Sequence, residues 1–305
     1  MKLKHIYAAA ALGVLGAFSG MAFAAPITLY INSAGSDMGG YDTTTGVLTN
    51  PLTQSIGNGR GVVVVGNIVY YTVADNGNVY RRDKNTNADL GIAFTVAGAT
   101  GLQAISYDGT NFWVGDYSGT TRAYYVNGTT GALITTITLN NGLSGGARDN
   151  AAGNIQGFYD GLEYFNGRLI ANRFDGGYGG TNVYDIYNLD GTINTLGFIT
   201  TAGHGNGTGI AFDGTNFYIS NIFNSSNEIT IWSGTTGAFI GNLNLAGSHG
   251  AIEDLSFDFA ARVDTCGGPN QPPCEGTGVP EPSTLSLFAL ALLGFGGFVR
   301  RRHRA

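Results

Sequence analysis

The chain has 305 residues, of which 50 are glycine, 16 tyrosine and 17 phenylalanine, and only 12% are charged. This composition is typical of short strands joined by tight turns and excludes a predominantly helical core. The formal net charge is −6, but six of the 15 basic residues lie in the two tails, which leaves 9 basic against 21 acidic residues. Because such a balance repels nucleic-acid backbones and anionic lipid, we expect no nucleic-acid partner.

The first 24 residues have the organisation of a secretory signal peptide. Lys2 and Lys4 precede the apolar run Ile6–Phe18, and the small residues at 22–24 follow it. The run is shorter than the ~20 residues that a spanning helix requires. We therefore expect a helical signal peptide at residues 1–24, with cleavage after Ala24 or Ala25 and export of the remaining chain.

A short turn recurs along residues 25–264. Its clearest copies are Tyr41–Leu48, Tyr125–Ile134 and Trp232–Ile240, and looser copies are Arg82–Asn87 and Tyr187–Thr192. Each copy has an aromatic or long side chain, a polar turn and a departing strand, and in most copies the turn contains glycine. A hairpin repeated every forty to sixty residues or so indicates a radial or stacked array of small sheets.

A second pattern recurs in register with the turn. Strand, tight turn and strand follow one another in Val62–Tyr71, Leu102–Val114, Gly161–Ile170 and Gly209–Ile219. The hairpins at Leu102–Val114 and Gly209–Ile219 are followed by a third and a fourth strand, and the other two by a third strand. Four strands in sequence form one propeller blade. Glycine-rich connections at 97–101, 202–207 and 246–250 precede opening strands at matching positions.

The first and last strands of the body each belong to an incomplete unit. Ile27–Asn32 and Tyr41–Leu48 supply later strands of a blade, whereas Ile252–Asp258 is an opening strand with no blade after it. Joining them gives a blade shared by the two ends of the chain, which leaves no free edge. We therefore expect an all-β propeller at residues 25–264 with five blades of four-stranded antiparallel sheets. Six blades are the alternative, because residues 140–156 could contain additional strands.

Residues 265–278 form a linker rich in proline and glycine. It contains Cys266 and Cys274, the only cysteines of the chain. In an exported protein we expect these two to form a disulfide, because free thiols or a metal site without a nearby histidine do not fit an oxidising compartment.

The last segment, 279–305, has three consecutive parts. Val279, Pro280, Glu281 and Pro282 precede the apolar run Leu285–Val299, and a basic cluster follows that includes Arg300, Arg301 and Arg302. We expect the run to form a C-terminal transmembrane helix, with the basic cluster on the cytoplasmic side. About fifteen residues are few for a permanent span, so we expect a temporary anchor.

This order of parts resembles the PEP-CTERM sorting signal of Gram-negative bacteria. The resemblance implies recognition of Pro280, Glu281 and Pro282 by a membrane-embedded exosortase and removal of the tail. It implies transient anchoring in the inner membrane and delivery to the outer surface or to an exopolysaccharide matrix of the kind found in biofilms. An ordinary C-terminal anchor is the alternative. The blades in turn resemble NHL-like repeat propellers, a resemblance that carries no catalytic residue to this chain.

Five residues are candidates for a ligand-binding site. Asp160, Glu253 and Asp254 fall at the starts of predicted innermost strands, where clustered carboxylates could shift one another's pKa, hold a cation or act as acid and base. Hydrogen bonding to loop amides is the alternative role. His204 and His249 occupy equivalent connections between blades, but a third ligand with metal-site spacing is missing.

Calcium is the only cofactor for which the sequence offers a pattern. Asp83–Asp89 places oxygen ligands at alternate positions, yet Ala88 stands where a calcium loop needs glycine and Phe94 where it needs glutamate. The stretch coincides with the recurring turn, so we interpret it as a turn and expect no cofactor.

These observations favour a non-catalytic, exported propeller that serves in adhesion, polysaccharide binding or structure at the cell surface, with exosortase and exopolysaccharide as partners. We assign no catalytic residue. One alternative is an extracellular polysaccharide lyase or hydrolase that uses the five candidate residues, and another is a calcium-stabilised structural module.

Overall fold

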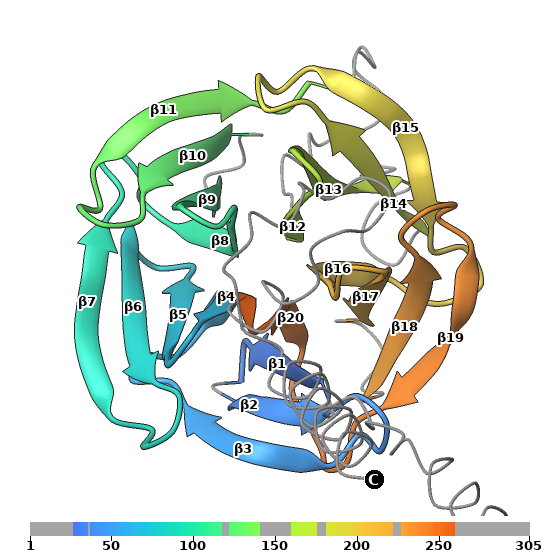
Figure 1. The fold of residues 1–305 in the computed structure, drawn as a ribbon, viewed down its shortest axis with the longest axis horizontal. Coiled ribbons are helices and arrows are strands. Elements are labelled where there is room, and N and C mark those ends of the chain that lie inside the picture. Colours follow the sequence, from blue (N-terminus) through green and yellow to red (C-terminus); the bar gives the residue numbers. More distant parts are fainter. Residues whose placement is uncertain are drawn as a thin grey trace, which may run out of the picture. The chain divides into compact units, whose positions relative to one another are not determined.

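The computed structural model describes residues 27–35, 37–117, 122–140, 160–175, 181–221 and 227–259. Its named elements are 20 strands, which form five four-stranded sheets. The sheets are arranged around one axis as the blades of a propeller (Figure 1). The predicted all-β architecture and the count of five blades are confirmed. The segment 141–156, which motivated the six-blade alternative, lies outside the described residues.

Within each blade, consecutive strands pair antiparallel from the axis outward. The blades, in that order of strands, are β20 (Ile252–Phe257), β1 (Thr28–Ser33), β2 (Asp37–Asp42) and β3 (Leu48–Thr53); β4 (Gly59–Val65), β5 (Ile68–Val73), β6 (Asn78–Asp83) and β7 (Asp89–Thr95); β8 (Leu102–Tyr107), β9 (Asn111–Asp116), β10 (Arg122–Asn127) and β11 (Leu133–Thr138); β12 (Leu162–Phe165), β13 (Arg168–Asp175), β14 (Thr181–Tyr187) and β15 (Ile193–Thr200); and β16 (Gly207–Phe212), β17 (Asn216–Asn221), β18 (Glu228–Ser233) and β19 (Phe239–Asn244).

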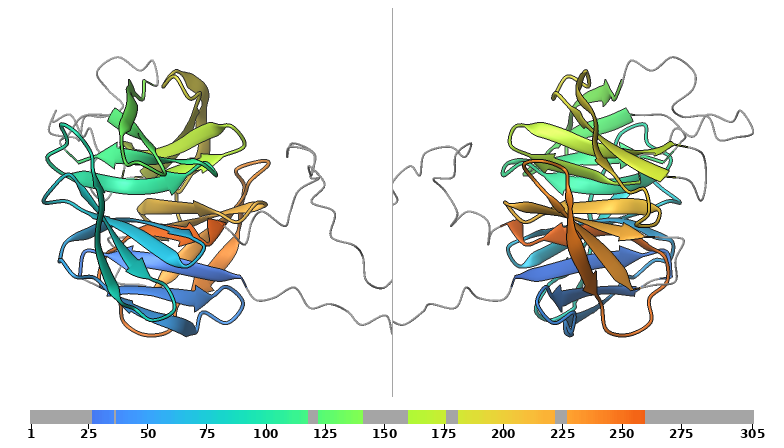
Figure 2. Two further views of the ribbon diagram at one scale, coloured as in Figure 1. Left: turned by 60° about the vertical axis from the view of Figure 1, so that its left-hand side comes forward. Right: turned by 90° about the vertical axis from the view of Figure 1, so that its right-hand side faces the viewer.

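The last strand of the described chain closes the ring. β20 pairs antiparallel with β1, with Leu255 opposite Ile31 and Phe257 opposite Leu29. In the side views, the darkest blue strands, β1–β3, and the orange-red β20 belong to one sheet (Figure 2). The predicted blade shared by both ends of the chain is confirmed. Closure in this way joins the two ends of the described chain within one blade through backbone hydrogen bonds and leaves no gap in the ring.

The recurring turn is stabilised by its first side chain. The Asp42 Oδ1 atom accepts hydrogen bonds from the Thr44 and Thr45 amides at 2.9 and 2.7 Å, and Asn127 Oδ1 does the same for the equivalent turn at 3.0 and 2.8 Å. The turn then needs a residue with positive φ, and at Gly237 φ is 66°. A Cβ atom at Gly237 would also overlap the carbonyl oxygen of Phe198 in the preceding blade, so that only glycine fits.

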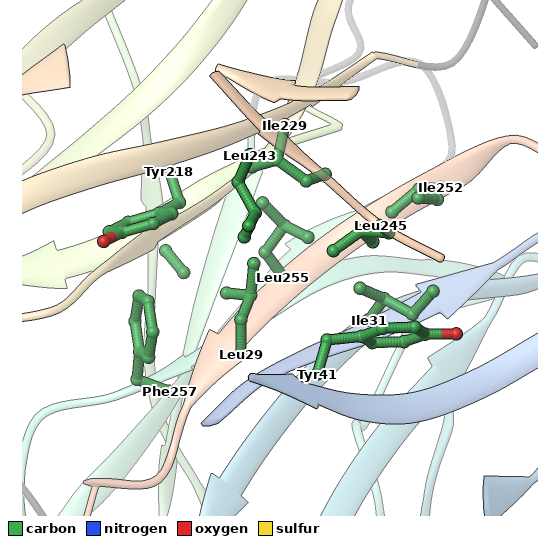
Figure 3. Close-up of a cluster of buried hydrophobic side chains, with 11 residues drawn as sticks. Leu29, Ile31, Tyr41, Tyr218, Ile229, Leu243, Leu245, Ile252, Leu255 and Phe257 are labelled. Carbon is green, nitrogen blue, oxygen red and sulfur yellow. The ribbon is translucent and has the colours of Figure 1, made fainter. Parts of the chain in front are cut away.

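The hydrophobic core lies between the blades rather than at the axis. One cluster joins the closing blade to the blade of β16–β19, and Figure 3 shows Leu29, Ile31 and Leu255 packed toward Ile229 and Leu243. All five side chains are buried, at 5% exposure or less. Because each blade buries one face against each neighbour, the blades stabilise one another and fix the directions of the innermost strands.

The tails carry several predictions that fall outside the described residues. These are the signal peptide, the Cys266–Cys274 disulfide and the C-terminal helix with its sorting motif. Among the residues that the structure does describe, no helix is both long and apolar enough to cross a membrane.

Candidate functional site: a polar ring at the propeller axis

One residue from each blade occupies the same position at the beginning of the innermost strand. In four blades, one residue of the innermost strand pairs with the last residue of the second strand. The residue directly after that pair is Arg60, Gln103, Thr208 or Glu253. Asp160 is their equivalent just before β12. The amide of Gly161 donates a hydrogen bond to a side chain of the second strand of its blade. The amides that follow Arg60 and Thr208, at Gly61 and Gly209, do the same. We call these five residues the axial ring.

Close approach of the innermost strands brings the axial ring together. The residue after the ring position is glycine in three blades, at Gly61, Gly161 and Gly209. A Cβ atom on any of the three would overlap the backbone of the innermost strand of the next blade. The absence of side chains at these positions therefore lets neighbouring blades approach each other at the axis.

An ion pair links two members of the ring. Arg60 Nη1 lies 2.5 Å from Glu253 Oε1, and the two side chains are 16% and 6% exposed. Arg60 also donates from Nη2 to the Tyr117 hydroxyl at 3.2 Å, and its guanidinium carbon lies 4.8 Å from the centre of the Tyr117 ring. Burial raises the pKa of Glu253, an effect that the Arg60 charge opposes.

Asp160 is the carboxyl group of the ring that lacks an ion-pair partner among the interactions of the described residues. Its Oδ1 accepts a hydrogen bond of 2.7 Å from Gln103 Nε2. Burial and, to a lesser extent, the negative charge of Glu253 raise the pKa of Asp160 to about 7, against the opposing effect of the Arg60 charge. At neutral pH the Asp160 carboxyl is therefore present in both protonation states and can donate or accept a hydrogen bond.

Thr208, the fifth ring residue, is used within the fold. Its hydroxyl donates to the carbonyl of Ile252 at 3.3 Å and lies 3.1 Å from Ser220 Oγ. Its carbonyl accepts a hydrogen bond of 2.8 Å from the Tyr184 hydroxyl. Burial, together with the charges of Asp160 and of a neighbouring aspartate on β20, raises the pKa of Tyr184 far above its usual range, so this tyrosine stays neutral.

Three polar atoms of the ring are buried without a hydrogen-bond partner among the described residues. They are Arg60 Nε, Gln103 Oε1 and Glu253 Oε2. Counted over the whole residue, Gln103 is 1% exposed and Glu253 5%. Buried polar groups are nearly always satisfied in folded proteins, so unpaired atoms on three of the five ring residues indicate a position for a ligand or ordered water.

Asp254 was predicted with Asp160 and Glu253, but its side chain has a different role. Its Oδ2 accepts a hydrogen bond of 3.1 Å from the amide of Val62 on β4. Farther along the chain, Ser256 of β20 accepts from the Val64 amide at 3.1 Å, and Asp258, just after β20, accepts from the Gly66 amide at 3.1 Å. Side chains of β20 thus satisfy the free edge of β4, and Asp254 joins two blades.

Glu163, which no sequence signal indicated, has a similar structural role in three other blades. Its Oε1 accepts from the Phe212 amide at 3.2 Å and its Oε2 from the Ser106 hydroxyl at 2.7 Å. Ser106 in turn accepts from the Tyr164 amide at 2.8 Å. These contacts connect β8, β12 and β16.

The two predicted histidines lie on aromatic residues of outer strands. The His204 ring stacks on Phe239 of β19 with centroids 3.8 Å apart, and it meets Trp232 of β18 edge-on. His249 Nε2 lies 3.1 Å from the hydroxyl group of Tyr41, which is on β2. None of the interactions described for either histidine involves Asp160, Glu253 or Asp254.

The stretch that resembled a calcium loop forms the recurring turn. Asp83 Oδ1 accepts hydrogen bonds from the amides of Asn85 and Thr86 at 2.9 and 2.7 Å. In the described part of the chain, no group of three or more His, Cys, Asp or Glu residues is placed to hold a metal ion.

Comparison with known proteins identifies the C-terminal segment and the fold. Residues 278–302 match the PEP-CTERM protein-sorting motif, which confirms the predicted signal. None of the curated proteins matches the chain. A solved structure from a nidogen/laminin complex has a TM-score of 0.51 and 11% identity and covers 76% of this chain and 98% of its own. Glutaminyl cyclase from Myxococcus xanthus has a TM-score of 0.43 and 12% identity and covers 80% of this chain and 82% of its own. At 11% identity, the likeness to the structure from the nidogen/laminin complex shows the fold alone.

Proposed function

We propose that the protein is a non-catalytic binding module of the bacterial cell surface or of an exopolysaccharide matrix, where its propeller body remains after the tail is removed. The observation that carries this proposal is the PEP-CTERM motif at residues 278–302, which is attached to a closed propeller. The motif implies export and sorting by an exosortase. The closed ring suits a protein outside the cell, because it presents no gap in its sheets and stabilises itself through every blade.

The route is tested in cells that make both the protein and an exosortase. We expect the body in the surface or matrix fraction, and we expect mass spectrometry of its C-terminal peptide to show that Arg300, Arg301 and Arg302 are gone. Substituting Pro280 and Glu281 by alanine is expected to retain the protein in the inner membrane. A wild-type protein found there with its arginine-rich end intact would contradict the proposal.

The binding role is tested with the processed protein and the polysaccharide of the same cells. We expect the protein to sediment with the insoluble polymer and to leave its chain length unchanged. Absence of binding to the polymer would contradict the proposed role.

A lyase or hydrolase is a second candidate, and the pKa of about 7 for Asp160 favours it. A carboxyl group that titrates near neutral pH beside a second carboxylate is suited to acid and base catalysis. If the protein is a lyase or hydrolase, we expect the chain length of the polymer to fall with time. We expect this degradation to be lost in Asp160→Asn and Glu253→Gln. Degradation that persists in both variants would remove these residues from any catalytic role.

A further inference from the structure

The unpaired atoms of the axial ring limit the chemistry of a ligand that would complete it. Gln103 Oε1 and Glu253 Oε2 can only accept hydrogen bonds, whereas Arg60 Nε can only donate one. A carboxylate or a phosphate diester cannot donate to the two acceptors, and its negative charge would meet the charge of Glu253. An ammonium group cannot accept from Arg60 Nε. A hydroxyl group both donates and accepts, and several hydroxyl groups on one ligand would satisfy all three atoms.

The surroundings of these atoms suit a sugar. Asp160, in both protonation states near neutral pH, adds a group that can donate or accept beside Gln103. Tyr117 adds an aromatic ring next to the Arg60 guanidinium, and the C–H faces of sugars pack on such rings. Arg60, Asp160 and Tyr117 are partly exposed, whereas Gln103 and Glu253 are buried. The ring therefore has an outer part that solvent reaches and an inner part that is buried.

The structure also explains why the unpaired atoms stay in place without a ligand. Gln103 is fixed through its Nε2 by Asp160, and Glu253 through its Oε1 by Arg60. Each anchored side chain therefore holds its second polar atom in one position. Preorganised polar atoms of this kind lower the cost of ordering the site when a ligand binds.

We propose that Arg60, Gln103, Asp160 and Glu253 form a binding site for a neutral, polyhydroxylated group, namely a sugar unit of an uncharged polysaccharide. This proposal rests on the proposed binding function and assigns that function to one place and one class of ligand. It requires no metal ion and no chemical step.

The test measures binding of the full exported protein to three oligosaccharides by isothermal titration calorimetry. Cellopentaose is the neutral probe, a chitosan pentamer the cationic probe and an oligogalacturonate the anionic probe. Two variants address the unpaired acceptors separately: Gln103→Met removes one acceptor at similar volume, and Glu253→Gln keeps the length of the other side chain. Asp190→Asn is the matched control, since this exposed carboxylate lies in a turn at the outer rim, where the Gly191 carbonyl accepts a hydrogen bond from the Asn140 amide just after β11.

We expect cellopentaose to bind and the two charged probes to bind at least tenfold more weakly. Either axial variant is expected to weaken cellopentaose binding at least tenfold. The control variant is expected to leave cellopentaose binding unchanged. Thermal unfolding of each variant, with one cooperative transition, shows that it is folded, and either folded axial variant is sufficient for the test. Preference for a charged probe, or cellopentaose binding unaffected by the axial variants, would overturn the proposal. No binding of any probe would also overturn it and would mean that the ring holds only water.

The native polysaccharide distinguishes this inference from the proposed function. If the wild-type protein and both axial variants bind that polymer equally, the function stands and the axial site is wrong. If the wild-type protein binds neither the polymer nor any probe, both proposals fail.

Discussion

Arg60 Nη1 lies 2.5 Å from Glu253 Oε1, so that β4, the innermost strand of one blade, is joined to the closing strand β20 at the propeller axis. The pair connects residues that are nearly two hundred positions apart in the sequence. Both side chains are largely buried, and a buried charge is tolerated only with a partner. The ion pair therefore contributes to closure of the propeller and is also part of the axial ring.

We predict that Arg60→Met destabilises the protein by about 3 to 5 kcal/mol, because it leaves Glu253 buried without its counter-charge. Urea unfolding at neutral pH measures the change. The double variant Arg60→Met with Glu253→Gln is expected to be more stable than Arg60→Met alone, since it removes the unpaired charge. Equal stability of the single variant and the wild type would show that the pair lies in water.

We predict that the stability difference between wild type and Asp160→Asn depends on pH. The pKa of Asp160 is raised from 3.8 to about 7 in the folded protein, so the folded state binds the proton more tightly than the unfolded chain does. This contribution to stability is complete below pH 4 and is lost as the pH rises toward 7. Asparagine resembles the neutral form at every pH.

Relative to Asp160→Asn, the wild type is therefore expected to be about 2 kcal/mol less stable at pH 8 than at pH 4.5. This figure is smaller than the ~4 kcal/mol that three pKa units correspond to, because Asp160 is partly exposed. Urea unfolding of both proteins at the two pH values gives the difference. A difference that is the same at both pH values, or of opposite sign, contradicts the environment described for Asp160.

We predict that Gly237→Ala destabilises the protein by about 2 kcal/mol or more. Its φ of 66° is unfavourable for alanine, and the new Cβ would overlap Phe198 O in the neighbouring blade. Gly241→Ala, a few residues along the same blade, is the control, because no atom lies within 4 Å of its Cβ position. Differential scanning calorimetry of the two variants measures the effect, and similar melting temperatures for both would refute the role of the turn.

We predict that a chain ending after Gly250 does not close the ring. It lacks β20, which pairs with β1 and satisfies the edge of β4 through Asp254, Ser256 and Asp258. We expect aggregation or rapid proteolysis of this chain, whereas a chain ending after Asp264 unfolds cooperatively. A soluble, protease-resistant product that ends at Gly250 would show that β20 is dispensable.

The fold was largely predictable because its repeated turn has strict local requirements. An oxygen-bearing first residue and a residue that adopts positive φ mark the turn in four blades, and the glycine-rich connections mark the blade starts. The strand β2 was harder to find, because Gly39 and Gly40 give it a weak strand pattern. Both positions are close to side chains of neighbouring strands, Leu48 and Thr28, and have no room for a Cβ atom. That requirement depends on tertiary packing.

The axial ring was predictable only in part. Asp160 and Glu253 stood out as carboxylates at the starts of innermost strands, and the structure places both in the ring. Arg60 and Gln103 did not, since neither forms a motif with its sequence neighbours. An alignment of the opening strands of the five blades would have identified them, because it places all five ring residues at the same position. No comparable sequence signal separates Asp254 from Glu253. These neighbouring carboxylates point to opposite faces because side chains alternate along β20.

A crystal structure of the exported protein with cellopentaose tests the axial ring most directly. We predict that one sugar unit lies at the axis, with hydroxyl oxygens within about 3.2 Å of Gln103 Oε1, Glu253 Oε2 and Arg60 Nε. A sugar bound only on the outer strands, with water alone at these three atoms, would contradict the account.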